Sequence, residues 1–248
     1  MADMESFDLL EGGFAFACHP AVACFTECCR DLKLVLTPYD LLRMKKALGL
    51  NSGDLLDRYI LIKPSELNGF PGLFLKMNED QRQTCPFVTS EGCRIYNDRP
   101  GACRIYPVGR ASSQPKGREG AREFHFLVKE AHCQGFKEPK EWTVREWSRD
   151  QGLEPYTLFN DLWTEIIQHK GSLGPEEAIP QKLHMFFMAC YNLDQFRSFV
   201  FKSTFLQRFD LDEARVRQIE SDDEALLQLA FEWLKMVLFG EKAIPLKS

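Results

Sequence analysis

Residues 85–107 read CPFVTSEGCRIYNDRPGACRIYP and contain three cysteines, two of them followed directly by arginine. Five more cysteines lie in the same half of the chain, in a C-x5-C-x3-C-C group upstream and singly downstream. The chain has 248 residues and nine cysteines, and eight of these precede residue 140. Clustering of this kind indicates metal or redox chemistry. The predicted metal ligands are Cys18, Cys24, Cys28, Cys29, Cys85, Cys93, Cys103 and Cys133.

Arginines accompany these cysteines. A thiolate is the form of cysteine that binds a metal, and four thiolates around one ion leave a negative site. Arginine directly follows Cys29, Cys93 and Cys103, and Arg99 lies between the last two. Because arginine keeps its proton, we expect it to lower thiol pKa values and to offset the charge of the site. Ordinary buried thiols are the competing interpretation, and we apply it to Cys190, which stands in an apolar helical pattern.

The spacing of the cysteines does not identify the metal. Structural zinc sites usually have two close cysteine pairs, and Cys24 with Cys28 forms only one. Iron–sulfur clusters accept wider spacings, so we favour an iron–sulfur cluster, 4Fe–4S, over zinc. Two four-cysteine sites, or one site with reserve ligands, both fit eight cysteines. The vicinal Cys28 and Cys29 cannot easily point the same way, so they serve different metals or only one is a ligand. His19 and His132 are further candidate ligands, with polar residues beside the site as the alternative.

The pattern of apolar residues predicts an α+β fold. We expect a small cysteine-cluster domain with short strands and helices at residues 1–140 and a mainly helical region at residues 141–248. Helices are predicted over 37–49 and near 55–60, and short strands of one small sheet over 73–77 and 124–128. Further helices are expected from Thr143, over 155–171, around 183–190, and from a capping box at Ser221 to Gly240. Residues 111–121 are typical of a flexible segment.

Composition narrows the class of protein. The chain is 44% hydrophobic with a net charge of −5, which suits a folded core. Residues 1–140 carry a net +1 and residues 141–248 a net −6, without the basic stripe of a nucleic-acid binder. No apolar run approaches the roughly 20 residues of a membrane span. The first eleven residues contain four acidic residues and no Lys or Arg, unlike a secretory signal, so we expect a cytoplasmic protein.

The stretch from Cys85 to Pro107 resembles the CPFL…C-x-IY-x-x-RP-x-x-CR-x-YP signature of the YkgJ-type cysteine cluster proteins. This family of zinc- or iron-chelating domains includes the flagellin lysine N-methylases. The upstream CxxCxxCC element is matched by Cys18, Cys24, Cys28 and Cys29, with x5 and x3 where the family has x2 and x2. The later C-x-G is matched by residues 133–135, and the similarity covers residues 14–136. The resemblance implies a metal-chelating, iron–sulfur, cytoplasmic bacterial protein.

Whether the chain is an enzyme stays open. A protein lysine N-methyltransferase is the alternative function, and it would need a site for S-adenosylmethionine. The glycine pair Gly12-Gly13 has no strand before it and no helix after it, so we interpret it as a turn. A third hypothesis is a zinc-stabilised interaction module whose acidic C-terminal helices dock a protein partner.

Overall fold

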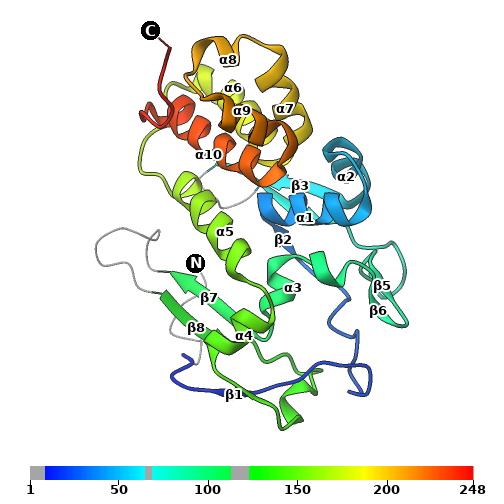
Figure 1. Cartoon of the computed structure of the whole chain (residues 1–248). Coiled ribbons are helices and arrows are strands. Elements are labelled where there is room, and N and C mark those ends of the chain that lie inside the picture. Colours follow the sequence, from blue (N-terminus) through cyan, green and yellow to red (C-terminus); the bar gives the residue numbers. More distant parts are fainter. Residues whose placement is uncertain (1–8, 65–68, 113–122, 248) are drawn as a thin grey trace. The chain divides into compact units, whose positions relative to one another are not determined.

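The computed structural model describes residues 9–64, 69–112 and 123–247 (Figure 1). Contacts divide the chain into two compact units, which we call unit 1 (Met1–Leu34 and Leu75–Leu158) and unit 2 (Val35–Phe74 and Phe159–Ser248). The domain boundary expected at residue 140 does not coincide with the bounds of these units, and it stays a prediction. Of the segment expected to be flexible, residues 113–121 lie outside the described residues.

Unit 1 is built from short antiparallel pairs and short helices. Its strands are β1 (Phe14–Ala15) paired with β9 (Glu141–Trp142), β5 (Val88–Thr89) with β6 (Gly92–Cys93), and β7 (Val108–Ser112) with β8 (Glu123–Leu127). Its helices are α3 (Gly101–Ile105), α4 (Val144–Asp150) and the beginning of α5 (Glu154–Ile167), with 3-10 turns η2 (Tyr96–Asp98) and η3 (Gly135–Lys137). In Figure 1, β7 and β8 lie side by side as the arms of a hairpin.

An aromatic core holds unit 1 together. Phe14, Phe16, Val108 and Trp147 form its buried cluster. The rings of Phe16 and Trp147 meet edge to face with centroids 5.6 Å apart, a preferred aromatic geometry. Trp147 follows the capping box predicted at Thr143, which is confirmed. The helix start thus fixes the position of a core tryptophan.

Unit 2 is mainly helical. Its sheet has the order β2-β4-β3, with β2 (Val35–Leu36), β4 (Pro71–Leu75) and β3 (Ile60–Pro64). Its remaining elements are α1 (Pro38–Leu48), α2 (Ser52–Tyr59), η4 (Glu176–Ala178), α6 (Ile179–Tyr191), α7 (Leu193–Lys202), α8 (Phe205–Arg208), α9 (Glu213–Ser221), α10 (Asp223–Phe239) and the later part of α5. The predicted α+β class, with short strands, small sheets and a mainly helical C-terminal half, is confirmed.

The helix ends of unit 2 confirm one capping prediction and correct another. Thr37 caps α1 in a complete capping box, and Gly49 ends it with φ +62°. At α10 the predicted box at Ser221 is wrong, because Ser221 is the last residue of α9 and its hydroxyl donates to Arg217 O. The carboxylate of Asp222 caps α10 instead, accepting from two backbone amides. Gly240 ends α10 with φ +76°, as expected.

The prediction of one small sheet joining the two central strands is wrong. Strand β4 pairs with β2 in unit 2, with Val35 opposite Phe74. Strand β8 pairs with its sequence neighbour β7 in unit 1, with Val108 opposite Leu127. Alternating apolar residues show that a segment is extended but do not choose its partner strand.

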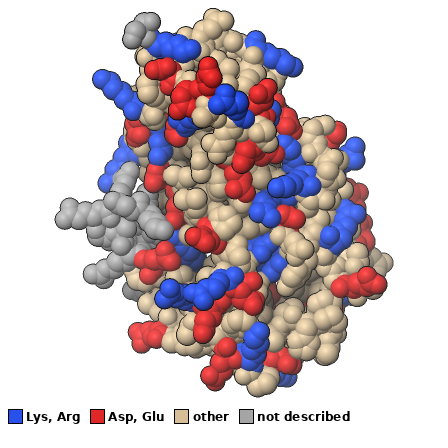
Figure 2. Space-filling model, viewed as in Figure 1, with Lys and Arg blue, Asp and Glu red and all other residues tan. Residues whose placement is uncertain are grey.

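The surface carries charges of both signs. On the face shown in Figure 2, acidic and basic side chains are interspersed. Within the described ranges, every helix is too short or too polar to span a bilayer.

Candidate metal centre

All eight predicted ligand cysteines fall in unit 1, and each is a free thiol. They come from three segments, 18–29, 85–103 and the single Cys133, although residues 35–74 between the first two belong to unit 2. Cys190 lies on α6 of unit 2, is 2% exposed, and has a pKa raised well above its usual value by burial. This placement fits the packing role expected for Cys190.

Two hydrogen bonds bring the segment around Cys133 against the first cysteines. The Ala17 amide donates to Gly135 O at 3.1 Å, directly before Cys18. The Gln134 amide donates to Sγ of Cys24 at 3.1 Å. A backbone N–H pointing at sulfur stabilises the thiolate form that binds a metal. Sequence reasoning missed this donor, because no sequence signal shows which way a backbone amide points.

Gly135 allows this close approach. A Cβ at this position would lie 2.6 Å from a ring carbon of Phe16 and 2.7 Å from Ala17 O. Only a residue without a side chain fits such a contact. The glycine in the Cys133-Gln134-Gly135 motif therefore has a packing reason in this fold.

Tyr106 borders the same cysteine. Its ring packs edge to face on Phe16 with centroids 5.8 Å apart, beside Cys133 at the edge of the aromatic core. Burial, and then the neighbouring Cys133 thiol, raise the pKa of the Tyr106 hydroxyl, which stays protonated and is available as a donor to sulfur. Tyr96, by contrast, is 55% exposed and lies under the Arg99 guanidinium.

The vicinal cysteines end a run of tight turns. The Glu27 amide donates to Cys24 O at 2.9 Å and the Cys29 amide to Thr26 O at 3.0 Å. Thr26 has φ +68°, a left-handed conformation that non-glycine residues rarely adopt. The two adjacent thiols affect each other: the neighbouring Cys29 thiol lowers the pKa of Cys28, and the neighbouring Cys28 thiol raises the pKa of Cys29. The prediction that Cys28 and Cys29 serve different metals, or that only one of them is a ligand, stays a prediction.

A second set of contacts links Cys29 to the central motif. The Cys85 amide donates to Cys29 O at 2.9 Å, next to a bridge between Arg30 and Thr84. The β5–β6 hairpin then places Cys93 opposite Val88, whose amide donates to Cys85 O at 3.1 Å. Cys29, Cys85 and Cys93 therefore follow one short ladder of backbone contacts.

Two of the four arginines act on these thiols. Burial raises the pKa of Cys93, and the charges of Arg99 and Arg94 oppose the rise. Burial also raises the pKa of Cys85, again opposed by Arg94. The Arg99 guanidinium is 8% exposed and interacts with the charges of both Cys103 and Cys93. The charges of Arg94 and Arg99 thus act in the predicted direction, but burial outweighs them and the pKa values of Cys85 and Cys93 are raised.

The other two arginines have different partners. Arg104 is buried and donates to the backbone oxygens of Asn97 and Gln151, while its guanidinium lies 4.8 Å from the Tyr156 ring centroid. Arg30 pairs with Glu27. Hydrogen bonds to carbonyl oxygens tie chain segments together, so Arg104 links helix α3, which carries Cys103, to the segments around Asn97 and Gln151.

The two histidines beside the cysteines have carboxylate partners. His19 lies 3.4 Å from Glu138, and His132 lies 3.3 Å from Glu130. Within the described part of the chain, no three His, Cys, Asp or Glu side chains are close enough to hold one metal ion. Among the described residues, the eight thiols therefore share one unit without forming a set of three or more metal ligands.

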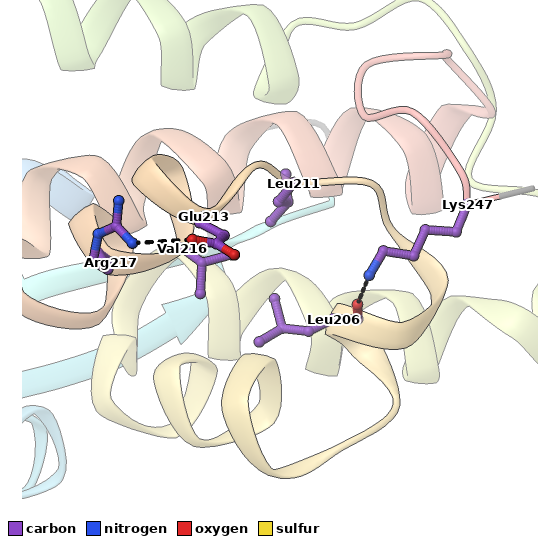
Figure 3. Close-up of a pocket in the computed structure, with 6 residues that line it drawn as sticks. All are labelled: Leu206, Leu211, Glu213, Val216, Arg217 and Lys247. Carbon is purple, nitrogen blue, oxygen red and sulfur yellow. Dashed lines mark hydrogen bonds and ion pairs between the residues drawn. The ribbon is translucent and has the colours of Figure 1, made fainter.

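One pocket lies elsewhere, in unit 2. It has a volume of about 360 Å³ (Figure 3) and is lined by Leu206, Leu211, Glu213, Val216, Arg217 and Lys247. Its polar groups are already engaged: Arg217 pairs with Glu213 at 3.4 Å and Lys247 Nζ donates to Leu206 O at 2.9 Å. This lining offers apolar side chains and paired charges, without a cysteine or histidine.

Comparison with known proteins points to the cysteine half of the chain. The family model described as "CxxCxxCC: Putative zinc- or iron-chelating domain" matches residues 17–138. No curated protein and no solved structure matches the chain. The matched range includes all eight cysteines of unit 1. Over residues 17–138 the chain therefore belongs to the CxxCxxCC family of zinc- or iron-chelating domains.

Proposed function

We propose that the chain binds an iron–sulfur cluster, of the 4Fe–4S type, through the cysteine thiolates of unit 1. The observation that carries this proposal is the meeting of three distant segments through backbone hydrogen bonds next to their cysteines. Cys85 N donates to Cys29 O, and Gln134 N donates to Cys24 Sγ. Contacts of this kind hold the ligand-bearing backbone in place before any metal is bound, which reduces the ordering cost of binding.

The donor set fits such a group. Thiolates are the usual ligands of iron–sulfur clusters, whose potentials respond to hydrogen bonds and nearby charge. This chain offers the Gln134 amide at Cys24 Sγ and the Arg99 charge beside Cys93 and Cys103. When bound, such a cluster supplies one-electron transfer or redox sensing.

The compartment follows from the same chemistry. Cysteines that bind a metal as thiolates must stay reduced, and reduced thiols persist in a reducing compartment. We therefore place the protein in the cytoplasm, and the family resemblance favours a bacterial source.

Anaerobic purification tests the proposal. We expect a brown protein with a broad absorption at about 400 nm and about four irons per cluster, with matching sulfide. A colourless protein that holds zinc in place of iron would contradict the iron–sulfur assignment and favour the zinc-stabilised interaction module. Protein that takes up neither metal would refute metal binding.

Matched variants locate the ligands. Cys93→Ser should lower metal content, whereas Cys190→Ser should leave it unchanged, because Cys190 is buried on α6 of unit 2. Metal loss in Cys190→Ser alone would show that the ligands have been assigned to the wrong cysteines.

The methyltransferase alternative has less support. Gly12 and Gly13 precede β1, which is followed by turns, whereas a dinucleotide-type loop needs a strand before it and a helix after it. Calorimetric titration of the metal-loaded protein with S-adenosylmethionine tests whether the chain binds this cofactor, and measurable binding would favour the methyltransferase.

A further inference from the structure

The corner between α4 and α5, residues 147–156, contacts the segment that carries the candidate ligands Cys93 and Cys103. This corner belongs to unit 1, but it lies beyond residues 17–138, the range that the family model matches. The position of the segment with these two cysteines therefore depends in part on residues outside the matched range.

Gln151, the residue that ends α4, accepts hydrogen bonds from two buried arginines of this segment. Its side-chain Oε1 accepts from the Arg99 guanidinium, and its backbone oxygen accepts from the Arg104 guanidinium. All three residues are buried. The Gln151 Nε2 group donates to the Asp150 carboxylate at 2.8 Å. This bond orients the side-chain amide with its oxygen toward Arg99.

The same two guanidiniums also bind the turn between the two cysteines. Arg99 donates to Tyr96 O at 2.6 Å, and Arg104 donates to Asn97 O at 2.5 Å. Both acceptors lie in η2. Each arginine therefore links the η2 turn to the residue that ends α4.

Two aromatic residues of the corner contact the segment at further points. The Tyr156 hydroxyl donates to Arg99 O at 3.1 Å, and the Tyr156 ring centroid lies 4.8 Å from the Arg104 guanidinium. The Trp147 indole N–H donates to Ile105 O at 2.8 Å. Both aromatic residues are buried. We call Trp147, Gln151 and Tyr156 the α4–α5 clamp.

The charge of the two arginines makes Gln151 the decisive residue of the α4–α5 clamp. Among the residues that the structure describes, neither Arg99 nor Arg104 forms an ion pair with a carboxylate. A buried guanidinium of this kind depends on its neutral acceptors, and losing one leaves a charged donor unsatisfied. Removing the Gln151 side-chain acceptor should therefore displace Arg99, and with it the η2 turn.

We propose that Gln151, through Arg99 and Arg104, positions Cys93 and Cys103 for metal binding. This proposal rests on the metal-binding function proposed above, and it gives Gln151 the role of a positioning residue, not of a ligand. The metal-binding domain then extends past residue 138, where the family match ends, to the beginning of α5.

Two substitutions at one position test this role. Gln151→Leu keeps the size of the side chain but removes the acceptor, whereas Gln151→Glu keeps an acceptor for Arg99. From metal-loaded protein purified anaerobically, EDTA should remove the metal at least about tenfold faster in Gln151→Leu than in the native chain. Gln151→Glu should restore the native rate. The control is Gln168→Leu, the same change at an exposed glutamine of unit 2, which should also release metal at the native rate.

Hydrogen exchange separates positioning from a general loss of stability. In Gln151→Leu, peptides covering residues 96–106 should exchange faster than in the native chain, whereas peptides from the β7–β8 hairpin of the same unit should not change. Equal acceleration of both sets would overturn the positioning role. Unchanged metal release in Gln151→Leu, or fast release in Gln151→Glu, would overturn it as well.

Tyr156→Phe covers the case in which Gln151→Leu fails to fold. This variant removes the hydroxyl that donates to Arg99 O and keeps the ring beside Arg104. We expect faster metal release and faster exchange over residues 96–106, and native behaviour in both would overturn the proposal. Native protein that binds no metal refutes the proposed function instead, and the exchange comparison on the metal-free chain then still tests the α4–α5 clamp.

Discussion

Replacing Gly135 by alanine tests the packing that brings Cys133 to the first cysteines. The new Cβ would lie 2.6 Å from a ring carbon of Phe16 and 2.7 Å from Ala17 O. Neither neighbour yields easily. The Phe16 ring is 2% exposed and packs against Trp147 at a centroid distance of 5.6 Å, and the Ala17 amide is bonded to Gly135 O.

The magnitude follows from two opposing effects. Inserting a methyl group into a packed site costs about 1–3 kcal/mol of unfolding free energy. Replacing glycine also reduces the conformational entropy of the unfolded chain, which stabilises the folded state by about 0.4–1 kcal/mol. We therefore expect Gly135→Ala to lower the stability of unit 1 by about 1–2 kcal/mol.

Hydrogen exchange of peptides covering residues 14–17 and 133–138 measures the local stability of unit 1 separately from that of unit 2. The matched control is Gly12→Ala, because a Cβ there has nothing within 4 Å. We expect faster exchange in Gly135→Ala and little change in Gly12→Ala. Equal protection in the two variants would refute the argument that Gly135 is required by close packing.

Three other predictions concern the two cores and one ion pair. Trp147→Phe leaves Ile105 O without its 2.8 Å donor and should cost about 1–2 kcal/mol, measured by thermal unfolding; an unchanged melting temperature would contradict this. Phe196→Ala, at a fully buried position, should cost about 3–5 kcal/mol in unit 2 without lowering metal content, and metal loss would count against separate units. Burial opposes ionisation of Asp194, but the hydrogen bonds from Lys45 Nζ at 2.8 Å and from the Ser52 amide at 2.6 Å, with the Lys45 charge, together outweigh it and lower the pKa. Asp194→Asn should therefore destabilise at pH 7, and the difference should vanish in melting curves as the pH falls through the folded-state pKa; a difference that persists in acid would exclude this ion pair as the cause.

Local signals in the sequence predicted the helix ends well. Thr37 and Gly49 delimit α1 because a hydroxyl cap and a left-handed glycine act within one turn of the chain. The same reasoning failed at Ser221, where α9 and α10 are separated only by Asp222. With two acceptors in adjacent positions, the one that lies outside the first helix becomes the cap.

Partners distant in the sequence could not be predicted. The strand predicted over 73–77 was expected to support the cysteine loops, but it forms as β4 over 71–75 and pairs with β2 and β3. Cysteine spacing identified the ligand candidates, whereas their grouping depends on contacts such as Cys85 N to Cys29 O. Such contacts are set by how loops fold back on one another, which leaves no periodic trace in the sequence.

The longer spacing of the first cysteines shows why contacts matter more than motif intervals. Between Cys18 and Cys24 the chain makes a turn in which the Val22 amide donates to His19 O at 3.0 Å, and Val22 is buried. The additional residues are thereby absorbed in a folded loop. Both ends of this loop are held by residues 134–135, through Ala17 at one end and Cys24 Sγ at the other. A candidate ligand held by such distant contacts keeps its place when the loop between ligands lengthens, so the unusual interval does not remove Cys18 from the candidate ligands.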